Sequence, residues 1–110
     1  MKVKIPDDVM VEIISRALDR ARRREYVICF QHMADVFGDA RKTKEFCSRK
    51  ADRVDVFTAE DFEVEARKWI QERRAWAYKV SSMRRKLRRW AKERNVVEYV
   101  KAGVYRVVNQ

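Results

Sequence analysis

The apolar residues change their spacing at Asn95, and this change constrains the fold more than any other feature of the sequence. Before it, apolar residues recur at the spacing of one helix face: Met83, Leu87 and Trp90. After it come two runs of strand-forming residues, 96–100 and 104–108, joined by a short segment that contains Gly103. The sequence therefore predicts a basic helix over Ser82–Asn95 followed by a β-hairpin.

The side of this predicted helix that faces away from the apolar residues is strongly basic. At about 100° per residue, four cations lie opposite the apolar stripe: Arg85, Arg88, Arg89 and Lys92. Like charges at helical spacing repel by roughly a few tenths of a kcal/mol per pair, so stability alone would favour interspersed acids. The whole chain has a net charge of +10, with most of the excess in its C-terminal half. This pattern indicates a polyanionic partner, either a nucleic acid or an acidic surface.

A strand and a capped helix are predicted before the basic helix. Val54–Phe57 is a short run of strand formers. Thr58 and Asp61 have the spacing of a capping box, and the helix that they open is expected to end near Arg73. We expect Trp69 on this helix to be a core anchor, as Trp90 is on the basic helix.

The connector Arg74–Val80 then leads to the basic helix. It contains Trp76 and Tyr78, which we expect to pack against the core rather than to stack on a nucleic acid. Ser81 and Ser82 offer hydroxyl groups for the N-cap of the basic helix.

The N-terminal half is predicted to be helical. Asp7–Arg24 follows Pro6 and has an apolar stripe that could extend the core or form a dimer interface. We interpret its final residues Arg22, Arg23 and Arg24 as a favourable helix end rather than a phosphate contact. The run 26–30 fits a strand or the start of a helix. Two shorter helices are expected on either side of a glycine C-cap at Gly38: Phe30–Phe37 and Ala40–Ala51.

Length and composition predict one domain over residues 1–110, in a chain that acts inside the cell. No apolar run approaches the roughly 20 residues of a membrane span, and the N-terminus lacks a signal-peptide core. Cys29 and Cys47 are expected to be reduced, partly buried thiols, with a single disulfide as the alternative. His32 is the one histidine and has no catalytic partner at a known spacing. We therefore expect no enzyme activity, no metal and no cofactor.

The order of predicted elements resembles the winged-helix family of DNA-binding domains. The resemblance is carried by Val54–Phe57, Thr58–Arg73, the start of the basic helix at Ser81–Leu87 and the wing Val97–Val108. It implies an α+β, mostly helical fold, with a winged-helix core at about 40–110 and an N-terminal helical extension at about 7–38. Proteins of this size and charge in the family are familiar among regulators of archaea and their viruses. The resemblance therefore implies a cytoplasmic protein, at the nucleoid or in a host cell.

The resemblance also implies which residues would contact DNA. The basic helix would enter the major groove of double-stranded DNA and regulate transcription by binding specific sequences. The candidates for base edges are Ser82, Arg85 and Arg89, because arginine can bond guanine in a bidentate manner. The candidates for phosphate and neighbouring backbone contacts are Arg84, Arg88 and Lys92, with Lys79 before the helix and Lys101 and Arg106 on the wing. Ser81 is a further candidate for DNA contact.

Three alternatives remain open at the level of sequence. The basic face could bind an acidic protein in a transcription or replication assembly, or it could bind RNA. A second resemblance links Gln31–Thr43 to the helix-glycine-helix stretch of helix-turn-helix proteins. In that case the residues that read the bases would be Arg41, Lys42, Thr43 and Lys44.

Overall fold

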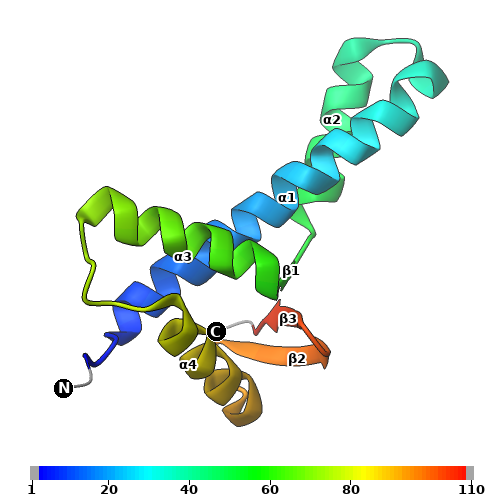
Figure 1. Ribbon diagram of the computed structural model, residues 1–110. Helices are drawn as coiled ribbons and strands as arrows, with labels where there is room; N and C mark the ends of the chain where they lie inside the picture. Colours follow the sequence, from blue (N-terminus) through cyan, green and yellow to red (C-terminus); the bar gives the residue numbers. More distant parts are fainter. Residues whose placement is uncertain (1–2, 109–110) are drawn as a thin grey trace.

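A computed structural model describes residues 3–108 of the chain, and within them the fold is α+β and mostly helical (Figure 1). The elements in order are α1 (Asp7–Phe37), α2 (Ala40–Asp52), β1 (Val56–Thr58), α3 (Ala59–Arg73), α4 (Val80–Glu93), β2 (Val97–Lys101) and β3 (Val104–Val107). The three strands form an antiparallel sheet in the order β1-β3-β2. The predicted fold class, α+β and mostly helical, is thus confirmed.

Helix α1 is one continuous helix of 31 residues. The open question about residues 26–30 is therefore settled in favour of helix, because no glycine or proline lies between Pro6 and Gly38. Gly38 has φ 62°, and its N–H donates to the carbonyl of Ala34 at 3.0 Å, which confirms the predicted glycine cap. The interpretation of Arg22–Arg24 as a helix end is wrong. Arg22 Nε instead donates to the carbonyl of Val54 at 2.9 Å, and Arg24 pairs with Asp61.

Helix α2 folds back along the distal half of α1, so that the two helices form a hairpin that projects from the rest of the molecule (Figure 1). The side chain of Asp39 caps α2 by accepting hydrogen bonds from the N–H groups of Arg41 and Lys42. Thr43 is fully buried, and its hydroxyl donates to the carbonyl of Asp39 at 2.8 Å. The hypothesis that Thr43 reads bases as part of a helix-turn-helix is therefore wrong.

The first half of α1 lies in the main hydrophobic core. Its predicted stripe, including Met10 and Ile14, is buried in the same cluster as Phe62 of α3 and Leu87 of α4. Phe57 of β1 and Tyr105 of β3 stack at 5.7 Å between ring centroids and close the core on the sheet side. The N-terminal helix therefore supports the helix that carries the basic face.

Helix α3 begins as the sequence predicts. The Thr58 side chain accepts from the N–H of Asp61, and the Asp61 side chain accepts from the N–H of Thr58, which completes the capping box. The preceding strand is displaced from the predicted Val54–Phe57, because pairing with β3 places Val56 opposite Arg106 and Thr58 opposite Val104.

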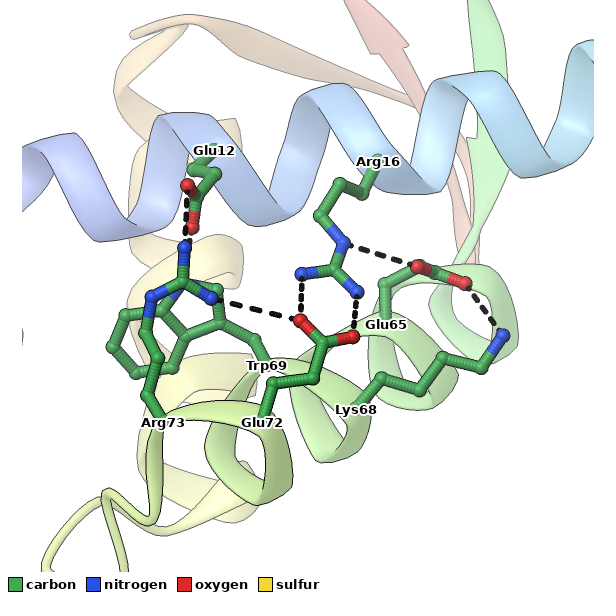
Figure 2. Close-up of polar contacts among 7 residues, drawn as sticks. All are labelled: Glu12, Arg16, Glu65, Lys68, Trp69, Glu72 and Arg73. Carbon is green, nitrogen blue, oxygen red and sulfur yellow. Dashed lines mark hydrogen bonds and ion pairs between the residues drawn. The ribbon is translucent and has the colours of Figure 1, made fainter.

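Polar side chains align α1 with α3 on the outside of the core (Figure 2). Arg16 of α1 donates to Glu65 at 3.2 Å and binds both oxygens of Glu72 at 2.9 and 3.0 Å. This pairing holds the pKa of Glu72 below its ordinary value. One turn earlier, Glu12 accepts hydrogen bonds from Trp69 and from Arg73, the latter at 3.0 Å. These contacts orient α3, against which α4 packs.

Candidate nucleic-acid interface

Helix α4 has an apolar inner face and a basic outer face, as the sequence predicts. Met83, Leu87 and Trp90 are buried in the core, together with Ala91. The cations on the opposite side are all exposed: Arg85, Arg88, Arg89 and Lys92. The helix therefore directs four positive charges to solvent within two to three turns.

The start of α4 differs from the prediction. The helix begins at Val80, Lys79 is its N-cap residue, and no side chain caps it. Val80 packs against the core, which extends the helix past the two serines that we expected to precede it. The N-cap role predicted for Ser81 and Ser82 is wrong. Both serines lie in the first turn, where Ser81 is exposed and Ser82 is half-buried.

The outer cations differ in whether they have acidic partners. Arg89 pairs with Glu93 at 3.6 Å on the exposed surface, where such pairs contribute little. Within residues 3–108, Arg85, Arg88 and Lys92 form no ion pair with any acid. Arg84 on the flank of the helix pairs with Glu63 of α3 at 2.6 Å. Three cations of the outer face therefore have no acidic partner within residues 3–108, whereas Arg84 is paired with an acid of α3.

A depression of about 600 Å³ lies beside the first turns of α4. Five basic side chains line it: Lys4, Lys79, Arg85, Lys86 and Arg89. Ser81 and Ser82 also line it. The structure thus brings together five of the candidate contact residues, namely Lys79, Ser81, Ser82, Arg85 and Arg89.

Lys86 is the buried member of this group. Its Nζ atom pairs with Asp7 at 2.8 Å and donates to the carbonyl of Ile5, which fastens α4 to the beginning of α1. It also lies 5.6 Å from the ring centroid of Trp90. The contribution of Lys4 and Lys86 was missed by sequence reasoning, because the contact between Ile5 and Lys86 spans 81 residues and has no local signal.

The hairpin β2–β3 carries the two remaining candidates to different places. Lys101 is exposed at the end of β2, next to the turn at Gly103. Arg106 pairs with Asp55 at 3.5 Å and with its cross-strand neighbour Glu98 at 3.4 Å. Because side chains alternate along a strand, Arg106 points to the opposite face of the sheet from Tyr105. Arg106 is therefore engaged by acids on the side away from the α4 core.

The connector between α3 and α4 contains one aromatic residue that departs from the prediction. Tyr78 packs on Trp69 with 5.7 Å between ring centroids, as expected. Trp76 is 65% exposed, so the expectation that it packs in the core is wrong. The connector is long enough that the chain turns without burying this indole.

Residues 3–108 offer no group of three or more histidine, cysteine, aspartate or glutamate side chains that could hold a metal ion. Across the same residues, no helix is long and apolar enough to cross a membrane. Comparison with known proteins finds no matching family model, no matching curated protein and no matching solved structure.

Proposed function

We propose that this chain is a winged-helix protein that binds double-stranded DNA through the outer face of α4 and regulates transcription by recognising specific sequences. The observation that carries the proposal is the row of exposed cations on α4, three of which have no acidic partner within residues 3–108. A helix with one face in the core and a basic face in solvent has the shape and charge that the major groove admits.

The order of elements supports the winged-helix part of the proposal. Strand β1, capped helix α3, connector, basic helix α4 and hairpin β2–β3 follow one another as in the family that the sequence resembles. The hairpin formed by α2 and the distal half of α1 is an addition to this arrangement, and it lies away from α4 (Figure 1). The basic face is therefore accessible without movement of the hairpin.

The proposed contacts form two groups. Arg85 and Arg89, with Ser82, would read base edges. Ser82 and Arg85 lie in the first two turns of α4, Arg89 follows one turn later, and all three line the depression beside the helix. Arg88 and Lys92, with Lys79 and Lys101, would bind phosphates. We leave Arg84 and Arg106 out of both groups, because each is held by an acid of the chain itself.

Binding to duplex DNA at increasing salt concentration tests the proposal. The two groups together contain six exposed cations: Lys79, Arg85, Arg88, Arg89, Lys92 and Lys101. If each of them displaces a counterion from the DNA, the logarithm of the affinity should fall against the logarithm of salt concentration with a slope of about −5. Lys92→Ala should reduce the magnitude of this slope by about 1 and weaken all sequences alike. Arg85→Ala should instead change the preference among sequences selected from a random library.

Lys44→Ala is the matched control. It removes the same charge from an exposed position on α2, at the opposite end of the molecule from α4 (Figure 1). It should leave both slope and preference unchanged. Equal effects of Lys92→Ala and Lys44→Ala would refute a specific interface on α4. Preferential competition by structured RNA, or tight binding of an acidic protein without duplex binding at low salt, would favour the corresponding alternatives.

A further inference from the structure

The helical hairpin contains two cysteines that the proposed DNA interface does not use. Cys29 of α1 and Cys47 of α2 face each other, and their Sγ atoms lie 2.8 Å apart. Cys29 is 4% exposed and Cys47 is fully buried. Both are free thiols in this structure. Two thiols in direct contact between neighbouring helices are an arrangement that packing alone does not require.

We propose that Cys29 and Cys47 are an oxidation site, at which a low-molecular-weight disulfide such as oxidised glutathione converts the two thiols into one disulfide that fastens α2 to α1. A disulfide bond is about 2.05 Å long, so the two sulfur atoms must approach by about 0.8 Å from their separation of 2.8 Å. Small side-chain rotations supply that movement, and the hairpin already holds the two helices side by side (Figure 1).

The reaction proceeds by two thiol–disulfide exchanges. The thiolate of Cys29 attacks one sulfur of the oxidant, forms a mixed disulfide and releases the first thiolate of the oxidant. The thiolate of Cys47 then attacks Sγ of Cys29, forms the internal disulfide and expels the second thiolate. The two protons lost by the cysteines end on the two released thiolates. The protein thus loses two electrons, and the oxidant gains them.

The structure indicates which cysteine reacts first. Cys47 Sγ donates a hydrogen bond to Cys29 Sγ. Cys29 is also the more exposed of the two. Burial, together with the hydrogen bond to Cys29, raises the pKa of Cys47 to about 11. Cys29 is therefore the attacking residue, and Cys47 resolves the mixed disulfide.

Burial also sets the speed of the reaction. Oxidised glutathione reaches Cys29 when α2 moves away from α1, and α2 makes no extensive contact with another element of residues 3–108. Opening of the hairpin therefore leaves the main core intact. The reaction should be slow at neutral pH and faster at higher pH, where more of the thiol is ionised.

The test is the mass of the folded wild-type chain after incubation with oxidised glutathione. We expect the loss of two hydrogen atoms, a peptide that joins Cys29 to Cys47, and reversal by dithiothreitol. A disulfide that closes a loop of this size should raise the melting temperature by roughly 10 °C relative to the reduced chain. An unchanged mass after prolonged incubation, a final glutathione adduct, a linked dimer, or an oxidised form that melts no higher would each overturn the proposal.

Two single variants distinguish the roles of the cysteines. Cys47→Ser should stop at a stable glutathione adduct on Cys29, whereas Cys29→Ser should react more slowly at the buried Cys47. The reverse pattern would overturn the assigned order of attack. If either variant fails to fold, the wild-type mass and melting temperature still decide the proposal. Duplex DNA plays no part in the assay, so its outcome is independent of the proposed function.

Discussion

Asp61 connects the start of α3 to the middle of α1, and its replacement by asparagine should destabilise the chain. The side chain is 1% exposed. Its two oxygens accept hydrogen bonds from Arg24 at 2.7 and 2.8 Å, and one of them also accepts from Arg20 at 3.2 Å. The other oxygen accepts from the N–H of Thr58 at 3.0 Å. Asparagine keeps the shape but has no charge and only one acceptor oxygen.

The expected loss follows from the number of bonds and the exposure of their donors. Hydrogen bonds to charged groups contribute about 1.5–3 kcal/mol each. The side chains of Arg24 and Arg20 are 46% and 34% exposed, so water partly replaces the lost carboxylate. One acceptor remains for Thr58 or for one arginine. We therefore expect Asp61→Asn to lower the free energy of unfolding by about 2 kcal/mol, which corresponds to roughly 8–12 °C in melting temperature.

The effect should depend on pH in a defined direction. Burial acts to raise the pKa of Asp61, but the hydrogen bonds from Arg24 and Thr58 outweigh it and hold the pKa below its ordinary value. A carboxyl group with a lower pKa in the folded state contributes fully above its unfolded pKa of about 3.9. That contribution is lost as the pH falls through the folded pKa. The difference between the two proteins should therefore shrink in acid.

Urea unfolding, monitored by circular dichroism at about pH 7 and about pH 3, measures the loss of unfolding free energy and its dependence on pH. Glu60→Gln is the matched control, because it removes a negative charge from an exposed position one residue earlier in α3. Its effect through the helix dipole should stay below about 1 kcal/mol. An equal loss for Asp61→Asn and Glu60→Gln, or a difference that persists undiminished in acid, would refute the argument.

Two further predictions concern backbone conformation and alkaline pH. Gly38→Ala should lower the free energy of unfolding by about 1 kcal/mol. Gly38 has φ 62°, which strains a residue with a Cβ atom, but the added atom would meet nothing within 4 Å. Thermal unfolding measures the loss, and a much larger value would show that steric contacts also contribute. Burial, with Tyr99 acting in the same direction, raises the pKa of Tyr105 above its ordinary value. The neutral phenol of Tyr105 therefore contributes fully to stability below about pH 10, and this contribution declines above it. Tyr105→Phe should remove this decline when stability is measured against alkaline pH. Identical profiles for the two proteins would contradict the raised pKa of Tyr105.

Local signals in the sequence were sufficient to predict three features of the C-terminal half of the fold. The capping box at Thr58, the apolar stripe of α4 and the glycine turn of the hairpin each lie within a few neighbouring residues. Their geometry follows from hydrogen bonds or periodicity inside one element. The same is true of Gly38, which ends α1 through its own backbone conformation.

Features decided by distant contacts were not predictable in this way. The cluster Arg22–Arg24 looks like a helix end, but Arg22 donates to Val54 and Arg24 pairs with Asp61, each more than 30 residues away. Helix α4 begins at Val80 and not at the predicted Ser82, because the Val80 side chain packs on the core. In each case a tertiary contact outweighs a local preference.

The same distinction decides which cations are available for a ligand. A helical wheel predicts that a side chain points outward, but it contains no information on acids elsewhere in the chain. Arg84 lies on the flank of the basic face, and its partner Glu63 comes from α3. A phosphate contact by Arg84 would have to displace that carboxylate. Arg84→Ala should therefore change stability more than the salt dependence of DNA binding, whereas Lys92→Ala should do the opposite, because Lys92 has no acidic partner within residues 3–108.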